Sequence, residues 1–515
     1  MFIKCLILIL FFSLMVGVGI YCRRHTSDVN GFVLGGRSVG PWLTAFAYGT
    51  SYFSAVIFVG YAGQFGWKFG LASTWVGLGN AFIGSLLAWS ILGRRTRLMT
   101  QHLDSATMPD FFGKRFNSRN LKIAASVIIF IFLIPYTASL YNGLSRLFGM
   151  AFNIDYTVCI VIMAILTGVY VTCGGYMATA INDFIQGIIM IGGIIIIIAA
   201  VLNTNGGFMG SLAALAQVSD PSVSDVPGVF ASFFGPDPFS LLCVVILTSL
   251  GTWGLPQMVQ KFYAIKSESD ISKGTVISTF FAIIVAGGCY FLGGFGRLMS
   301  DKVDIAANGY DSIIPAMLQD LPDILIAVVI VLVLSASMST LSSLVLASSS
   351  TLTLDFLKTT VMKDMNEKKQ LFCIRFFIII FIAISVVIAI LQYKSSVTFI
   401  AQLMGISWGA LAGAFLAPLL YSLYSKKTSK ASVWCCFIFS TVVMTANILF
   451  RASFPAVLQS PINCGAFVML MGLVIVPVVS AFTKKQDART LDEFFSCYEH
   501  KVLVAAKDAL GDEAE

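Results

Sequence analysis

Five hydroxyl side chains gather on one face of an apolar segment and are the residues of this sequence best suited to bind an ion. The segment Ser335–Ser343 reads SASMSTLSS and lies inside an apolar run over residues 322–357. On a helix, where each residue turns the chain by about 100°, the hydroxyls form a stripe about a quarter-turn wide. The stripe and its immediate edge consist of Ser335, Ser339, Thr340, Ser342 and Ser343.

Two interpretations of this stripe are open from the segment alone. Hydroxyls in hydrocarbon need polar partners, and the ordinary partner is a carbonyl one turn back or a group on a neighbouring helix. The other partner is a small hard cation, which prefers oxygen ligands. The elements that surround the stripe decide between the two.

The composition predicts an all-α polytopic membrane protein. The chain has 515 residues, of which 57% are hydrophobic and 11% charged, and no soluble domain has that balance. Apolar runs long enough to cross a bilayer predict about thirteen spans. They cover residues 2–21, 39–65, 70–93, 123–151, 156–172, 180–201, 238–260, 274–296, 322–357, 376–393, 396–423, 431–450 and 461–482.

The basic residues follow the predicted topology. The net charge is +7, yet 26 of the 33 Lys and Arg residues fall in segments on one side of the membrane. This distribution matches the positive-inside rule and predicts an outer N-terminus, a cytoplasmic C-terminus and an odd number of spans. It also removes the reason to expect a nucleic-acid partner, so we expect none.

Two of the predicted spans should be broken. Gly49–Ser54 places one glycine and three hydroxyl residues in the middle of the second span, and Gly251, Gly254 and Pro256 interrupt the seventh. Non-helical backbone at membrane depth is tolerated where it lines a cavity, and glycine and proline break helices. Each break opens a block of five spans, and the second block enters the membrane from the opposite side. This is the pattern of an inverted-repeat transporter with its binding site at the breaks.

The predicted organisation follows from these blocks. An extra N-terminal helix and loop precede the first five-helix repeat, an outer loop separates it from the second, and two peripheral helices and a cytoplasmic tail follow. The predicted boundaries are 1–37, 38–201, 202–236, 237–424, 425–482 and 483–515.

With the breaks in view, the cation interpretation of the stripe gains weight. Thr50 and Phe53 lie where the first break should expose carbonyls, and together with Ser339 and Thr340 they could form an oxygen cage for Na⁺. Asp183 heads the sixth span. It could face Ser342 and Ser343 as an anionic ligand, or it could simply favour the positive end of its own helix.

Four segments resemble the sodium:solute symporter family, most closely its bacterial sodium/proline branch. The similar segments are FVLGGRSVGP (32–41), GTSYFS (49–54), Gly174-Gly175 followed by DFIQ (183–186), and ASMSTLSS (336–343). The resemblance implies a LeuT-like core of two inverted five-helix repeats and transport of a small solute with Na⁺ as coupling ion.

The resemblance also implies ligands. The shared sodium site would use the carbonyls of Thr50, Phe53 and Ala336 and the hydroxyls of Ser339 and Thr340. A second sodium site, present in some members, would correspond to Asp183, Ser339, Ser342 and Ser343. We expect no organic cofactor.

The substrate positions depart from the proline carriers. Those carriers have Asp where this chain has Tyr52, and Trp and Tyr where it has Thr248 and Thr252; the proline at Pro256 is kept. The predicted solute pocket, suited to a small polar organic solute, is lined by Tyr52, Gln64, Thr248, Thr252, Trp253 and Pro256. Trp253 and Tyr52 could equally be packing aromatics.

The expected function is uptake of such a solute by alternating access, coupled to inward Na⁺ movement across a plasma membrane, most simply a bacterial inner membrane. A transporter-like sensor and a passive solute channel are the alternatives. An enzyme is not expected, because the only histidines are His25, His102 and His500, all outside the predicted spans. The sequence leaves the oligomeric state open, with a monomer as the working expectation.

Overall fold

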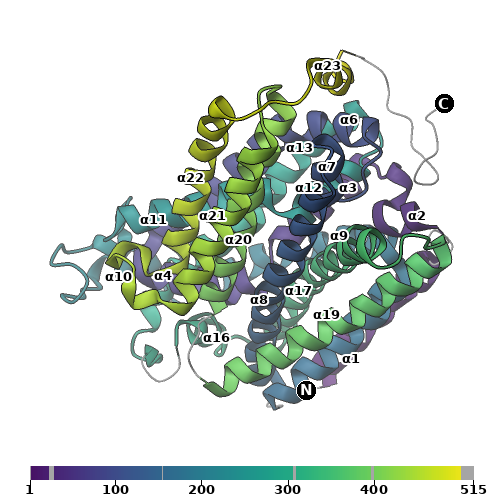
Figure 1. The fold of residues 1–515 in the computed structure, drawn as a ribbon. Helices are drawn as coiled ribbons and strands as arrows, with labels where there is room; N and C mark the ends of the chain where they lie inside the picture. The colour runs from purple at the N-terminus through teal and green to yellow at the C-terminus, as the bar shows by residue number, and fades with distance from the viewer. Residues whose placement is uncertain (1, 23–27, 153–154, 306–308, 396–399, 500–515) are drawn as a thin grey trace.

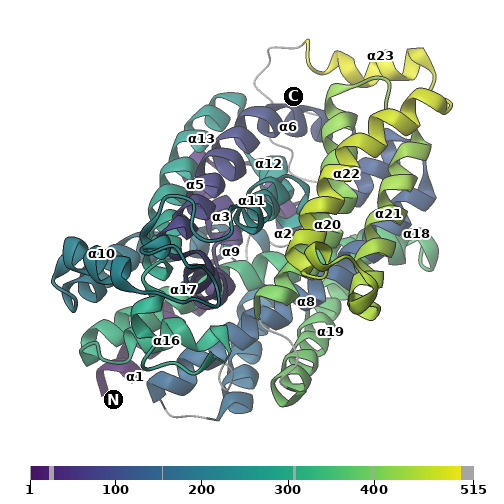
Figure 2. The ribbon, with the colours of Figure 1, turned by 90° about the vertical axis from the view of Figure 1, so that its left-hand side faces the viewer.

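A computed structural model describes residues 2–22, 28–152, 155–305, 309–395 and 400–499. Over these residues the secondary structure is helical, and pairing between extended segments is limited to isolated bridges such as Val39 with Ile265. The helices form one bundle (Figures 1 and 2). Helix α1 (Phe2–Tyr21) begins at the end of the molecule opposite to the short helix α23 (Ala488–Ser496) (Figures 1 and 2).

Within the described residues, nine helices are long and apolar enough to cross a membrane, and one bent pair raises the number to ten. The prediction of about thirteen spans therefore differs from the observed count. Two predicted spans correspond to shorter apolar helices, Leu6–Tyr21 and Tyr156–Val169. Two others meet in one helical stretch, Val56–His102, which continues past Gly70, a glycine with a φ of 62°.

Both predicted breaks are present. Helix α3 (Pro41–Tyr52) ends at Phe53, whose backbone is extended (φ −81°, ψ 122°), and a π-helical turn then leads into α4 (Ala62–Phe69). In the second break, Leu255 has nearly the same backbone angles (φ −80°, ψ 122°). It joins the segment Pro238–Gly254 to α12 (Pro256–Ala264) with a bend of 45°.

Helix α17 (Asp323–Thr351) is the central helix of the bundle and carries the hydroxyl stripe. It packs against α3, α8 (Arg119–Phe152) and α9 (Tyr156–Asn203). Every residue from Leu332 to Thr351 is buried, as expected for a helix surrounded by other helices. The stripe is therefore enclosed by protein and does not face lipid.

The remaining long helices enclose this centre. Helix α20 (Ile400–Tyr424) packs between α8, α21 (Lys430–Leu449) and α22 (Pro461–Phe482). Helix α19 (Glu367–Ser395) packs against α8, α9 and α17, and α1 packs against α9 and α17. The shorter helices are α2 (Val29–Leu34), α5 (Thr74–Ala81), α6 (Arg94–His102), α7 (Met108–Arg115), α10 (Gly207–Gln217), α11 (Pro238–Val245), α13 (Glu268–Ala282), α14 (Gly288–Gly293), α16 (Ile313–Leu318) and α18 (Lys358–Thr360).

The connection between the predicted spans 156–172 and 180–201 is a kink within one helix, α9. Gly175 has a φ of 55° and a ψ of −155°, a non-helical conformation that kinks α9. Such a conformation is open to glycine at little cost. A Cβ on Gly175 would also lie 2.9 Å from the ring of Phe32, so the kink brings α2 close to α9.

Helices α4 and α14 touch backbone to backbone, and this contact gives the first prediction. A Cβ on Gly66 would lie 1.8 Å from the carbonyl oxygen of Gly293, so Gly66→Ala must push the helices apart. Overpacking of this kind costs at least about 1–3 kcal/mol, and we expect a lower melting temperature in detergent. Gly192→Ala is the control, because nothing lies within 4 Å of its Cβ. Equal melting temperatures for the two variants would contradict the prediction.

Candidate functional site

Five oxygen atoms from α3 and α17 meet where α3 ends. The Thr340 hydroxyl lies 3.0 Å from the Thr50 carbonyl oxygen, 3.2 Å from that of Phe53 and 3.0 Å from that of Ala336. The Ser339 hydroxyl lies 3.1 Å from the Thr50 oxygen and 3.0 Å from the Ala336 oxygen. All five residues are fully buried. The structure thus brings together the whole set predicted for the shared sodium site.

This cluster has more oxygen–oxygen contacts than hydroxyl protons available to bridge them. Five oxygen–oxygen contacts of 3.0–3.2 Å are supplied by two hydroxyl groups, and each hydroxyl carries one proton. A cation would satisfy the lone pairs that remain. Oxygen ligands about 2.4 Å from one ion in an octahedron are about 3.4 Å apart, close to the spacing observed here. The donor set is neutral and consists of oxygen alone, which suits an alkali ion.

The helix break is what makes two of these carbonyls available. The last carbonyls of a helix have no partner within it, and α3 ends at the extended residue Phe53. A residue that the sequence interpretation missed, Ser337, supports the break from α17. Its hydroxyl accepts a hydrogen bond of 3.3 Å from the backbone N–H of Ala55. Ser337 was missed because it lies off the predicted stripe. The only hint in the sequence was that hydroxyl residues stand on both sides of Met338.

The residues predicted for a second sodium site lie next to this cluster. An ammonium group that the sequence did not predict there, that of Lys261, lies beside two of them. The Lys261 Nζ lies 3.7 Å from Asp183 Oδ2 and donates a hydrogen bond of 3.1 Å to the Ser343 hydroxyl. Ser343 also shares a 2.7 Å hydrogen bond with Ser51, and Ser342 donates to the Ser339 carbonyl at 2.8 Å. From the sequence, Lys261 was counted only as one of the basic residues on the cytoplasmic side. Residue spacing alone does not show that its side chain contacts Asp183.

A small cavity adjoins the first break. Its free volume is about 10 Å³, room for at most about one water molecule, so the cavity is nearly closed in this conformation. Its lining contains two of the six predicted solute residues, Tyr52 and Thr252, and no charged side chain. The complete lining is Tyr48, Gly49, Tyr52, Phe53, Asn80, Gly84, Ser85, Thr252, Met258, Ser278, Phe281, Ala282 and Ala286.

The other four predicted solute residues lie outside this lining. Trp253 donates from its indole N–H to the Ile83 carbonyl at 2.9 Å, and Thr248 donates to the Val244 carbonyl of its own helix at 2.8 Å. Pro256 is the first residue of α12, and Gln64 is buried on α4 beyond the break. Proline fits the first turn of a helix because its missing N–H has no partner there.

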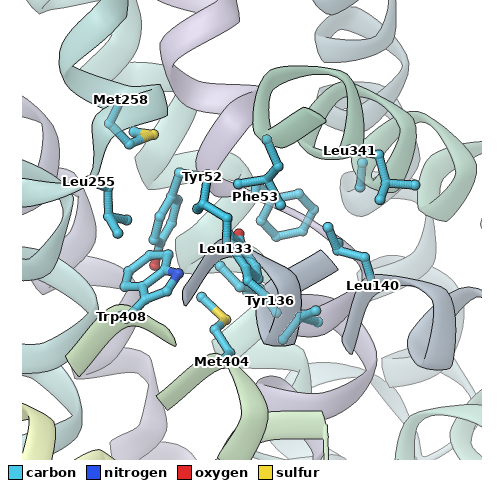
Figure 3. Packing of buried hydrophobic residues seen from close by; sticks show 14 of the residues in the cluster. Tyr52, Phe53, Leu133, Tyr136, Leu140, Leu255, Met258, Leu341, Met404 and Trp408 are labelled. Atoms are coloured by element: carbon cyan, nitrogen blue, oxygen red, sulfur yellow. The ribbon is translucent and has the colours of Figure 1, made fainter. Parts of the chain in front are cut away.

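Tyr52 joins an aromatic group that closes one side of the break (Figure 3). Its ring centroid lies 5.5 Å from that of Trp408 on α20, and Tyr136 on α8 lies 5.9 Å from Trp408. Trp408 is fully buried. The packing interpretation of Tyr52 therefore holds alongside its position in the cavity lining, and it connects the first break to α20.

Two donors of the cavity lining remain open. The Tyr52 hydroxyl interacts with the side chains of Asn80 and Tyr290, but among the described residues neither this hydroxyl nor the Asn80 Nδ2 makes a hydrogen bond of full geometry, although both side chains are buried. Asn80 Oδ1 accepts a 3.0 Å hydrogen bond from Ser249. Buried polar groups without partners are costly, and a polar solute would satisfy them.

Comparison with known proteins identifies the class. The family model of the sodium:solute symporter family matches residues 32–439. The osmoregulated proline transporter OpuE of Bacillus subtilis is 29% identical over 82% of this chain and 84% of its own length. A sodium/proline symporter of Staphylococcus aureus is 28% identical over 82% of this chain and 81% of its own length.

Solved structures agree on the fold. A Na⁺-coupled sialic acid symporter in a substrate-bound outward-open state superposes with a TM-score of 0.73, covering 95% of this chain and 99% of that one at 16% identity. Inward-facing Mhp1 superposes with a TM-score of 0.51 at 12% identity, covering 89% and 95%. The fold is thus that of the LeuT-like symporters. The chain belongs to the sodium:solute symporter family, and it is a multi-pass membrane protein that couples solute uptake to Na⁺.

The position of Trp253 gives the second prediction. Because its indole caps the Ile83 carbonyl and does not line the cavity, Trp253→Phe should destabilise the fold by about 1 kcal/mol. The KM for the solute should stay the same. Trp42→Phe, at a side chain that is 58% exposed, is the control and should change neither quantity. A raised solute KM with an unchanged melting temperature would place Trp253 in the solute site instead.

Proposed function

We propose that the coupling Na⁺ binds among the carbonyls of Thr50, Phe53 and Ala336 and the hydroxyls of Ser339 and Thr340. The observation that carries this proposal is the convergence of five buried oxygens at 3.0–3.2 Å with only two protons between them. In addition, two of the carbonyls belong to a helix break, where irregular backbone in a membrane protein commonly lines an ion site.

The proposed role of the ion is to hold α3 against α17. Both helices contribute ligands, so Na⁺ stabilises the arrangement in which the end of α3 meets the stripe, and conformations that separate them lose that stabilisation. The same α3 segment lines the small cavity through Gly49, Tyr52 and Phe53. Ion binding therefore organises the solute cavity, and closure around the solute precedes inward release by movement of one helix group against the other.

The proposed solute is small, polar and without net charge, with a proline-type compound as the leading class. The lining of the cavity has amide, hydroxyl and aromatic groups and no charged side chain. The two relatives named for proline share most of their length with this chain. The differences at Tyr52, Thr248 and Thr252 noted above leave room for a related small solute in place of proline itself.

The remaining features of the proposal concern topology. The matching breaks at Phe53 and Leu255 support two inverted repeats over residues 38–201 and 237–424. The distribution of Lys and Arg supports an outer N-terminus and a cytoplasmic C-terminus. A plasma membrane fits the bacterial relatives, and a monomer remains the working form.

The sodium site gives the third prediction. Thr340→Val removes one hydroxyl at nearly constant volume and should raise the half-saturating Na⁺ concentration about tenfold, which corresponds to about 1.4 kcal/mol. Thr340→Ser keeps the hydroxyl and should stay within about twofold of wild type. The measurement is solute uptake into proteoliposomes, with choline replacing Na⁺ at constant ionic strength.

Ser349→Ala is the matched control on the same helix, because among the described residues its hydroxyl donates a hydrogen bond to the Val345 carbonyl of that helix and takes no part in the oxygen cluster. Wild-type sodium dependence in Thr340→Val would refute the assignment. An equal effect in Ser349→Ala would show that the loss is not specific to the oxygen cluster.

The solute cavity gives the fourth prediction. A screen of amino acids, monocarboxylates, sugars and sialic acids under an inward Na⁺ gradient first identifies the solute. For that solute, Asn80→Ala removes the open amide donor and should raise KM about tenfold, with the half-saturating Na⁺ concentration little changed. Ser249→Ala removes the same Asn80–Ser249 hydrogen bond from outside the cavity and should leave KM within about twofold. Equal KM values in both variants would exclude Asn80 from the site.

A further inference from the structure

Lys261 is a buried cation that the sodium mechanism does not use. It lies on α12, the helix that follows the second break, and its side chain is only 4% exposed. Its ammonium group has three neighbours. It lies 3.7 Å from Asp183 Oδ2 on α9, 3.1 Å from the Ser343 hydroxyl on α17, and 5.0 Å from the centre of the Tyr176 ring on α9. The ammonium therefore connects α12 with the two helices that carry the predicted second sodium ligands.

Among the described residues, Lys261 is the one cationic side chain found beside Asp183. The Asp183 side chain is fully buried, and within the described part of the chain neither carboxylate oxygen accepts a hydrogen bond. The neighbouring amides turn elsewhere, since Asn182 Nδ2 donates to the Met15 carbonyl and Gln186 Nε2 contacts the Met15 sulfur. A buried carboxylate needs a counter-charge, and here Lys261 supplies it.

The ammonium and a second sodium ion would compete for the same oxygens. The predicted second site consists of Asp183, Ser339, Ser342 and Ser343, and Lys261 already contacts the carboxylate and the Ser343 hydroxyl. Adding Na⁺ would place two positive charges within a few ångströms of each other beside one carboxylate, in a region of low dielectric where repulsion is strong. Occupancy by one cation leaves the region neutral, whereas occupancy by both does not.

We propose that the Lys261 ammonium takes the place of a second sodium ion, so that this symporter binds and moves one Na⁺ for each solute molecule. The proposal rests on the proposed function only in that the remaining Na⁺ is assigned to the oxygen cluster of Thr50 and Thr340. Lys261 is here a fixed cation that belongs to the protein. It neutralises Asp183 without contributing an ion to the transported charge.

The fifth prediction counts bound sodium directly. Purified full-length protein in detergent is titrated with ²²Na⁺ in a choline buffer without solute, and the number of ions bound per chain is measured. We expect one ion for wild type and one for Lys261→Arg, which keeps the charge. We expect two for Lys261→Met, which removes the charge at similar length and leaves Asp183 and Ser343 free to bind Na⁺. The double variant Asp183→Asn/Lys261→Met should return to one.

The outcomes separate this inference from the sodium-site proposal. Thr340→Val should weaken binding of the single wild-type ion about tenfold, and unchanged affinity in that variant contradicts the shared site while leaving the lysine inference standing. Two ions bound by wild type, or no gain of an ion in Lys261→Met, overturns the lysine inference whatever Thr340→Val does. If Lys261→Met does not fold, the charge moved per solute by wild-type proteoliposomes decides: one supports the inference and two overturns it.

Discussion

The contact between the end of α3 and the hydroxyls of α17 is the interaction on which the rest of this structure depends. A helix that stops inside a membrane protein leaves carbonyl oxygens without partners, and at Thr50 and Phe53 those oxygens meet Ser339 and Thr340 at 3.0–3.2 Å. Two hydroxyl protons cannot serve all the contacts. In the sodium site that we propose, a cation completes these contacts, so the stability of the α3–α17 contact would depend on Na⁺.

The second break extends this dependence to the solute and to Asp183. Leu255 repeats the backbone angles of Phe53, and the segments on either side of it have separate tasks. Thr252, before the break, lines the small cavity, whereas Lys261, after it, reaches Asp183 and Ser343. Any movement of α12 relative to α9 and α17 must therefore separate a buried ion pair. Such a cost is tolerable only when other contacts form at the same time, so the ion pair favours the arrangement in which α12 stays docked.

Much of this could be predicted from sequence, and the part that could not has a physical cause. Glycine, hydroxyl and proline patterns act locally, so the breaks after Tyr52 and before Pro256 and the stripe on α17 were all visible. The positions of side chains that depend on how helices rotate and pack against each other could not be predicted from the sequence. Four of six predicted solute residues lie outside the cavity lining, because a broken helix does not keep one residue face across the break. Asn80 and Trp408 reach the site from positions whose local sequence carries no special signal, and Ser337 lies off the predicted stripe. The ends of the predicted spans were inaccurate where glycine bends a continuous helix.

The charge arrangement at Lys261 bears on how strongly the protein can concentrate its solute. Moving one charge through 100 mV supplies about 2.3 kcal/mol, and a tenfold sodium gradient adds about 1.4 kcal/mol. One ion therefore supports roughly 500-fold accumulation of an uncharged solute, and two support about 10⁵-fold. A chain that fills its second cation position with a lysine gives up the larger ratio. In return it avoids leaving Asp183 as an unpaired carboxylate in the membrane whenever sodium is absent, and its α12 contact no longer varies with the outer sodium concentration. The hydroxyl cluster is then the only place among the described residues where we assign sodium, so coupling between ion and solute must pass through the end of α3.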